Sequence, residues 1–251
     1  MKQPRNIAGI DGCRAGWLVV AARSSAHRLT DRVCFIAPTI AGATAQLSHD
    51  ALIAVDIPIG LLDEPRAGGR DIDRALRELL GPRRASVFSP PPRCLLDCHD
   101  YAHALTICRS RGDATALSKQ SWNILRKIRE CDALVRALAE RHPPRPRLHE
   151  VHPEWCWGAM RSGDPHRPEP ARHPKRTPEG RAERLRLLRE HDLEPLAGAV
   201  SLLSPAVAAM DDLLDAHAAL WTARRLERGE AVPLIERAEP DGVGVPISMH
   251  C

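Results

Sequence analysis

The sequence predicts an α/β fold in which a mixed sheet is flanked by helices. Four short apolar runs, separated by turns, occupy the first 60 residues, as expected for strands. Most of the remaining chain has apolar side chains at helical spacing or is broken by proline and glycine. With 251 residues the chain can bury a large core, so we expect 1–251 to form one domain with a helical insertion at 61–146.

The expected strands of the first part are 6–11, 16–22, 32–37 and 51–57. A short helix at 39–48 is expected before the last of them. The run 51–57 is apolar on both faces, which is typical of a central strand covered on both sides. Pro58 and Gly60 then end this strand.

Helices are expected in the middle of the chain at 71–80, 97–109 and 120–141. A segment with three prolines, 141–147, ends this block. The next residues, 147–153, are expected to form a short strand followed by a turn. Residues 161–176 are rich in Pro, Arg and His without apolar periodicity, so we expect a loop there.

Two helices are expected near the end of the chain, at 178–191 and 205–228. Ser204 is a suitable N-cap for the second, Pro205 suits its first position, and Gly229 lies just past its end. Residues 243–248 are a candidate for a last edge strand.

Composition limits the classes of function. The formal net charge of +4 permits a polyanionic partner without requiring one. Of the 36 basic residues 32 are Arg, which a GC-rich genome explains at least as well as phosphate recognition. The eight cysteines are spread along a chain without a signal-peptide core, so we expect a reduced, cytoplasmic protein. No apolar run approaches the roughly 20 residues that span a bilayer, so no membrane partner is expected.

Acidic side chains stand at or near the ends of predicted elements. Asp11 and Asp56 each end an apolar strand, and Glu150 lies on the strand expected at 147–153. Asp215 lies on the late helix, with Asp212 one turn before it. Mg²⁺ and Mn²⁺ prefer oxygen ligands, so the expected metal ligands are Asp11, Asp56, Glu150 and Asp215. The alternative is that each acid is solvated, caps a helix or pairs with an arginine.

His152 lies two residues after Glu150, so the two side chains share a strand face. It would activate water or orient a phosphate, or else stabilise the turn at Pro153. Several basic or hydroxyl side chains are candidates for phosphate contacts, with solvated loop residues as the alternative. They are Arg14, Arg83, Arg84, Ser86, Arg93, Lys175, Arg176 and Arg181.

A stretch at 94–108 is rich in Cys and His, but its spacing matches no common two-Cys, two-His zinc signature. Trp155 and Trp157 are expected to pack in the core rather than stack on bases. Aromatic residues make up only 3% of the chain, whereas proteins that bind single strands usually present aromatic platforms.

The sequence resembles the DUF429 family, whose members are described as predicted ribonuclease H-like nucleases. The first matching segment is Gly9-Ile10-Asp11-Gly12-Cys13-Arg14-Ala15-Gly16-Trp17, and the others are 54–61, 73–75, 80–88, 128–132, 150–154, 180–185 and 212–216. The resemblance implies a ribonuclease H-like fold with a metal-binding acidic cluster. Asp11 would lie on the first strand, Asp56 on the fourth and Glu150 on the strand after the insertion. Asp212-x-x-Asp215-Ala216 is similar to the last catalytic helix of RuvC-type resolvases.

These observations together predict a divalent-metal-dependent nuclease that cuts DNA or RNA with a metal-bound water. Its metal-binding acids would be assisted by Asp212 and His152. One alternative is an ATP-dependent phosphotransferase of the actin/hexokinase type, which also has an Asp-Gly strand end but usually has two lobes. The other is a non-catalytic nucleic-acid-binding protein that keeps the fold. The sequence leaves the oligomeric state open.

Overall fold

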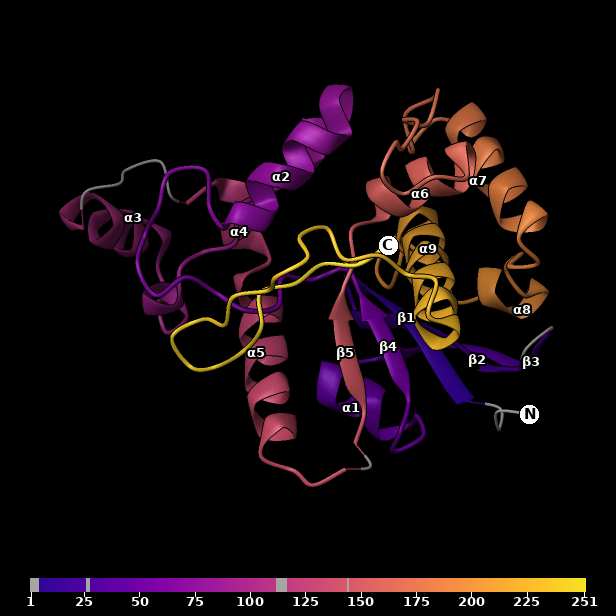
Figure 1. Cartoon of the computed structure of the whole chain (residues 1–251), viewed down its shortest axis with the longest axis horizontal. Coiled ribbons are helices and arrows are strands. Elements are labelled where there is room, and N and C mark those ends of the chain that lie inside the picture. Colours follow the sequence, from indigo (N-terminus) through magenta and orange to yellow (C-terminus); the bar gives the residue numbers. More distant parts are fainter. Residues whose placement is uncertain (1–4, 26–27, 112–116, 144) are drawn as a thin grey trace.

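The computed structural model describes residues 5–25, 28–111, 117–143 and 145–251, and its centre is one five-stranded sheet (Figure 1). The strand order is β3-β2-β1-β4-β5. β2 is antiparallel to both β1 and β3, whereas β4 is parallel to both β1 and β5. The predicted mixed α/β fold with a helix-flanked sheet is therefore confirmed.

Five of the six expected strands are present. They are β1 (Arg5–Cys13), β2 (Gly16–Ser24), β3 (Leu29–Ala37), β4 (Leu52–Val55) and β5 (Arg147–Glu150). β5 is shorter than expected because His152 is already the N-cap of the next helix. The edge strand expected at 243–248 is wrong, since this segment takes part only in an isolated bridge between Pro240 and Pro246.

Nine α-helices lie within the described ranges. They are α1 (Ile40–Ala45), α2 (Asp71–Leu80), α3 (Tyr101–Ser110), α4 (Lys119–Asn123), α5 (Leu125–Ala139), α6 (Pro153–Ser162), α7 (Pro178–Glu190), α8 (Ala197–Val200) and α9 (Met210–Arg228). Two 3-10 turns, Gly81–Ser86 and Arg93–Leu95, follow α2. The single helix expected at 120–141 is two helices, because the chain leaves helical geometry at Ile124.

Helix α9 begins five residues later than the sequence suggests. The N–H groups of Val207 and Ala208 both donate to the Ser204 carbonyl, which closes a turn instead of starting a helix. Ala209 is the N-cap, and the Asp212 carboxylate accepts its N–H at 2.8 Å. A side chain three residues inside the helix therefore decides where α9 starts.

Helix α6 was not expected from the sequence. Its residues from Trp155 to Met160 are all buried, whereas Glu154 and Arg161 near its two ends are partly exposed. The prediction that Trp155 and Trp157 pack in the core is confirmed, because their exposed fractions are 1% and 0%. The loop expected at 161–176 is confirmed after α6 ends at Ser162.

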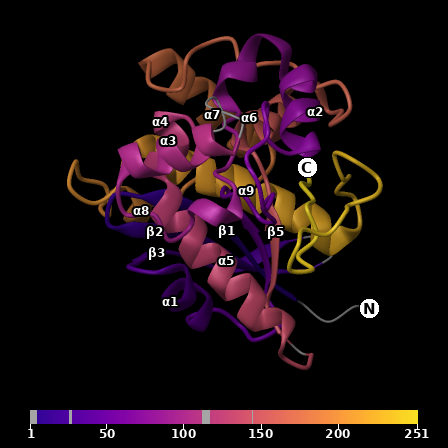
Figure 2. The same ribbon diagram turned by 90° about the vertical axis from the view of Figure 1, so that its left-hand side faces the viewer.

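Helices cover both faces of the sheet. α9 packs on one face, where Ile7, Leu18 and Leu52 meet Leu213 and Leu220. α1 and α5 cover the other face. Figure 2 shows α5 in front of the sheet and α9 behind it. Because α5 is part of this sandwich, only the portion of 61–146 that precedes it lies away from the sheet. No helix in the described part of the chain is apolar over a length that would cross a bilayer.

Candidate functional site

The parallel register of β1 and β4 places Asp11 beside Asp56. Ile10 pairs with Val55, and the Asp56 N–H donates to the Ile10 carbonyl at 3.0 Å. The next residue on each strand is therefore an aspartate at the same edge of the sheet. Side chains alternate between faces, and Ile10 and Val55 belong to the core on the α1/α5 side. Asp11 and Asp56 consequently face α9.

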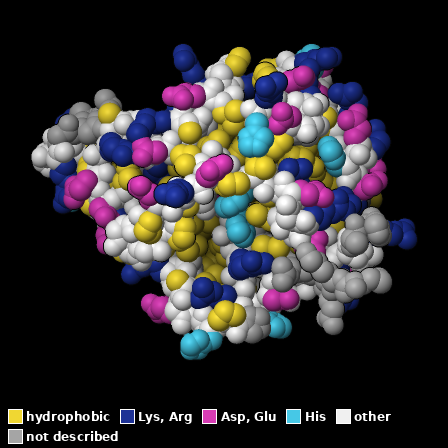
Figure 3. All heavy atoms as spheres, viewed as in Figure 1, with side chains coloured by type: hydrophobic (Ala, Val, Ile, Leu, Met, Phe, Trp, Pro, Cys, Tyr) yellow, Lys and Arg dark blue, Asp and Glu magenta, His cyan; other side chains and the backbone are white. Residues whose placement is uncertain are grey.

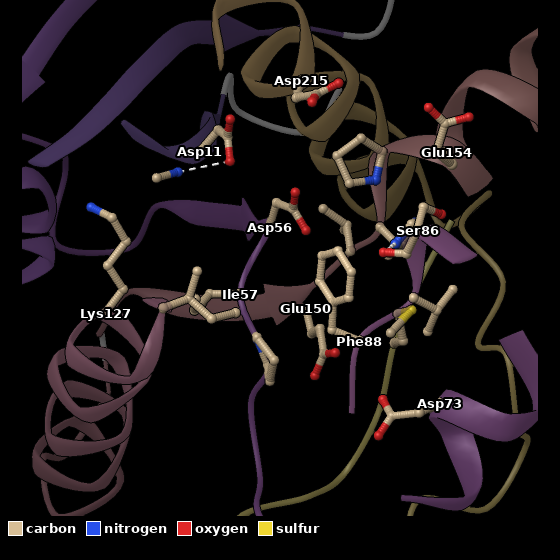
Figure 4. A pocket seen from close by; sticks show the side chains of 18 of the residues that line it. Asp11, Asp56, Ile57, Asp73, Ser86, Phe88, Lys127, Glu150, Glu154 and Asp215 are labelled. Atoms are coloured by element: carbon tan, nitrogen blue, oxygen red, sulfur yellow. Dashed lines mark hydrogen bonds between the residues drawn. The ribbon is translucent and has the colours of Figure 1, made fainter. Parts of the chain in front are cut away.

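Gly9 allows α9 to approach this edge closely. A Cβ atom on Gly9 would lie 2.1 Å from the Ala216 carbonyl oxygen and 2.1 Å from the Leu220 nitrogen. The backbone of α9 therefore packs directly on β1, and Asp215, next to Ala216, reaches the strand ends. Asp11, Asp56 and Asp215 line one pocket (Figure 4).

Asp215 is buried and both of its carboxylate oxygens are bonded. Oδ1 accepts a hydrogen bond from the Trp157 indole at 3.1 Å. Oδ2 accepts one from the Lys175 ammonium at 2.7 Å. The loop before α7 thus inserts a positive charge among the three aspartates.

Burial and mutual repulsion raise the pKa of the two strand-end carboxyls. Burial raises the pKa of Asp11 well above its usual range, and the charges of Asp56 and Asp215 add to this. Burial and then Asp215 raise the pKa of Asp56 to about 8. Burial lowers the pKa of Lys175, but Asp215 and the other two aspartates raise it by more, so Lys175 stays charged. The pocket therefore favours a further cation or a bound proton.

Glu150 lines the same pocket and its charge helps to raise the pKa of Asp56, but its carboxylate is not grouped with the three aspartates. It pairs in register with Val55, so it lies on the sheet face opposite to Asp11 and Asp56. The Arg70 guanidinium donates to both of its oxygens at 2.6 and 2.8 Å, and the Ile59 N–H donates at 2.7 Å. Arg70 also bonds Asp73, which makes a buried three-residue network. In Figure 4 the Glu150 carboxylate points away from those of Asp11 and Asp215.

Asp212 and His152 lie at the margin of the pocket. The Asp212 carboxylate caps α9, and burial raises its pKa. His152 lines the pocket and lies 3.3 Å from the Ser86 carbonyl through Nε2. Burial lowers its pKa, so the ring is neutral and donates from Nε2. Its buried Nδ1 has no hydrogen-bond partner within the described structure and is an available acceptor.

The expected phosphate-binding residues divide into two groups. Ser86, Lys175 and Arg176 line the pocket. The others do not line it, and most of them contact other parts of the chain. Arg14 and Arg83 donate to the carbonyls of Pro205 and Ala171, each at 2.6 Å. Arg93 donates to Asp132 at 2.8 Å, Arg181 lies 3.8 Å from Asp211, and Arg84 is exposed.

The pocket itself has a volume of about 390 Å³ and lies where β1, β4 and β5 end. Its acidic side is opposed by apolar residues from several loops, including Ile57, Phe88, Ile124 and Met249. It therefore combines a charged end with an apolar wall.

Residues 9–239 match the family model described as a protein of unknown function, DUF429. The chain belongs to this family. Comparison with curated proteins and with solved structures finds no match. All three clustered aspartates of this DUF429 chain lie within the matched residues, but the family description assigns them no activity. Function must therefore be argued from the site.

Metal binding in this DUF429 chain has to be judged from its oxygen donors. Within the described ranges, no group of three or more His, Cys, Asp or Glu side chains is arranged to hold a metal ion. This includes the Cys/His stretch at 94–108, where Cys98 and Cys108 pack with Leu95 and Leu117 in a small apolar cluster. Zinc binding there has no structural support.

Sequence reasoning missed several residues that shape the pocket. Trp157 was assigned to packing alone, although its indole also holds Asp215. Arg70 and Glu150 are 80 residues apart, and no spacing rule connects them. Phe88 could have been proposed from the sequence, because it is one of few aromatic residues and lies just before three consecutive prolines.

Proposed function

We propose that this chain is a divalent-metal-dependent phosphodiesterase of ribonuclease H-like type that hydrolyses nucleic acid. The observation that carries the proposal is the convergence of Asp11, Asp56 and Asp215 from β1, the end of β4 and α9 on one pocket. The strand positions of Asp11 and Asp56 agree with those that the family resemblance implies. Glu150 is left out of the proposed ligand set because Arg70 holds it.

The donor set suits Mg²⁺ or Mn²⁺. Three carboxylates supply hard oxygen ligands. Burial and mutual repulsion raise the pKa of Asp11 and Asp56, and a divalent cation would relieve the repulsion. Asp11, Asp56 and Asp215 would hold the ion, but they are not arranged around a metal as they stand. The Lys175 ammonium occupies Asp215 Oδ2 and would have to be displaced. When bound, the ion would supply an activated water and neutralise charge on a phosphate.

Neighbouring side chains have definite tasks under this proposal. Lys175 and Trp157 fix the Asp215 carboxylate in one orientation. Lys175 and Lys127 both line the pocket and are cations available to a phosphate oxygen there. The free Nδ1 of His152 can accept a proton or a hydrogen bond inside the pocket.

A hydrolysis assay tests this function directly. The purified protein should cleave a mixed panel of DNA and RNA oligonucleotides with Mg²⁺ or Mn²⁺ and stop when EDTA is added. Asp11→Asn and Asp215→Asn should each lower the rate by about 100-fold or more. Asp97→Asn, at an exposed site outside the pocket, is the matched control. Cleavage that resists EDTA, or that survives Asp11→Asn, would refute the proposal.

A second function is favoured by one observation. Asp56, with a pKa of about 8, lies beside Asp215, which is ion-paired with Lys175. Two carboxyls held in different protonation states can act as acid and base without a metal. EDTA-resistant hydrolysis with a rate that falls above pH 8 would support this alternative.

The other two alternatives have less support. The described residues contain one five-stranded sheet, whereas a phosphotransferase of the actin/hexokinase type usually has two lobes. A rise in melting temperature with ATP, but not with other nucleotides, would support the phosphotransferase. Nucleic-acid binding without cleavage under any metal condition would favour a non-catalytic protein.

A further inference from the structure

Phe88 is an aromatic ring that the fold leaves uncovered. Its exposed fraction is 42%, and it is the one aromatic residue in the described part of the chain that is largely exposed. Trp17, Trp155 and Trp157 are by contrast fully buried. Among the described residues, Phe88 is not part of the buried apolar clusters, so its uncovered face is available to a ligand.

The backbone that carries Phe88 is held on both sides. The Arg77 guanidinium donates to the Val87 carbonyl at 3.1 Å and to the Ser89 hydroxyl at 2.7 Å. The Ser121 hydroxyl donates to the Ser89 carbonyl at 2.5 Å. Three prolines follow directly and restrict the chain further. The ring is therefore presented from a fixed loop, so little conformational entropy is lost when it binds a ligand.

The ring belongs to the same pocket as the acidic cluster. Phe88, Ile57, Pro58 and Ile124 provide its apolar wall. Figure 4 shows the Phe88 ring among the labelled pocket side chains. A ligand for this pocket needs a flat apolar part for the wall and an anionic part for the metal and Lys175.

The volume of the pocket limits the size of this ligand. At about 390 Å³ it lies at the small end of the range of roughly 300–1,000 Å³ for ligand pockets. It is suited to one nucleotide rather than to a length of duplex. On the face shown in Figure 3, basic and acidic side chains are interspersed rather than forming a basic track along which a duplex backbone could lie.

We propose that the pocket takes a single nucleotide unit of an unpaired strand, with the base stacked on Phe88 and the phosphate at Lys175 and at the metal that Asp11, Asp56 and Asp215 would hold. This inference rests on the proposed function and adds its substrate class. Base–aromatic stacking tolerates any base, so the pocket selects unpaired nucleotides rather than a sequence. A base in a duplex is covered by its neighbours and cannot reach the ring.

Binding of two small probes tests the base contact. AMP and ribose 5-phosphate carry the same phosphate, but only AMP has a base. With Mn²⁺ present, calorimetry should show that Phe88→Ala weakens AMP binding by about 5- to 100-fold and leaves ribose 5-phosphate unchanged. Phe88→Trp should retain AMP binding. Val33→Ala, at an exposed apolar site on β3, is the control. Equal affinity of the two probes for the unaltered protein, or no binding of AMP, would overturn the inference.

A cleavage assay on strands distinguishes recognition of a nucleotide unit within a strand from binding of a free nucleotide. A single-stranded oligonucleotide should be cut faster than the same sequence in a duplex, and Phe88→Ala should remove this preference. Equal rates on both substrates would overturn the inference. If Mn²⁺ binds and strands are cut without any dependence on Phe88, the proposed function stands and the nucleotide pocket fails. If AMP binds through Phe88 but no metal binds and nothing is cut, the proposed function fails instead.

Discussion

At the scale of single residues, Lys175 supplies the positive charge that the acidic pocket needs. Its ammonium lies 2.7 Å from Asp215 and adjoins Asp11 and Asp56, whose charges stabilise it. A divalent ion bound by the same carboxylates would compete with this contact. Lys175 therefore stabilises the metal-free protein and opposes metal binding.

Replacing this lysine should separate the two effects. Lys175→Met should lower the free energy of unfolding without metal by about 1 kcal/mol, because a partly exposed pair contributes little. Mn²⁺ should bind several-fold more tightly to the variant, measured by calorimetry, since no ammonium competes for Asp215. Lys119→Met, at an exposed lysine on α4 outside the pocket, should leave the affinity for Mn²⁺ unchanged. Weaker Mn²⁺ binding by Lys175→Met would contradict this competition.

Glu150 provides a second test at this scale. Its pairing with Arg70 is buried, so Glu150→Gln should cost about 3–5 kcal/mol of stability in denaturant unfolding. The affinity for Mn²⁺ at low temperature should stay within about twofold, because Glu150 lies outside the three-aspartate group. Asp215→Asn is the comparison and should abolish Mn²⁺ binding. A large loss of Mn²⁺ affinity in Glu150→Gln would show that Glu150 is one of the metal ligands.

At the scale of elements, the contact between β1 and α9 decides the geometry of the site. Gly9 has no side chain, and α9 occupies the space that one would need. The distance between the strand ends and Asp215 therefore depends on a position that carries no functional group.

A methyl group at this position should force the two elements apart. Because the atoms that would clash are backbone atoms, Gly9→Ala should destabilise the fold by about 3 kcal/mol and lower activity as well. Gly198→Ala is the matched control, since nothing lies within 4 Å of a Cβ added on α8. That control should be neutral or slightly stabilising. Equal thermal melting of both variants would show that α9 does not pack as described.

At the scale of the whole molecule, buried histidines link stability to pH. Burial lowers the pKa of His217 on α9 to about 4 and that of His149 on β5 to about 4. As the pH falls, these two histidines take up protons near pH 6.5 in the unfolded chain but only near pH 4 in the folded protein. Stability is therefore fully present above pH 6.5 and is lost as the pH falls toward 4.

For His217 this loss should reach about 3 kcal/mol at pH 4, because its side chain is almost fully buried. His217→Gln should flatten the dependence of the unfolding free energy on pH between 6.5 and 4. His173→Gln, at an exposed histidine, should leave the dependence intact. Denaturant unfolding at a series of pH values measures both. An unchanged slope in His217→Gln would show that His217 titrates normally.

Local patterns were sufficient to predict most of the strands and helices. They also placed four candidate acids, Asp11, Asp56, Glu150 and Asp215, on their elements, but they did not show which of these acids are grouped. Apolar runs that end in a carboxylate set Asp11 and Asp56 at strand ends. The spacing of α9 places Asp215 on its buried side. Helix α6 was missed because it begins at Pro153, three residues after β5, where a turn was expected. The start of α9 was misplaced because a turn competes for Ser204.

Only the tertiary structure decided which acids meet. The register between β4 and β5 turns Glu150 to the face opposite Asp56, where Arg70 neutralises it. A shift of one residue in that register would reverse the faces, and no local pattern reports it. Lys175 and Phe88 reach the pocket through long-range packing of loops. Local sequence patterns thus placed the acids on their elements, whereas strand register and helix approach decided which of the pocket acids are grouped and which one Arg70 neutralises.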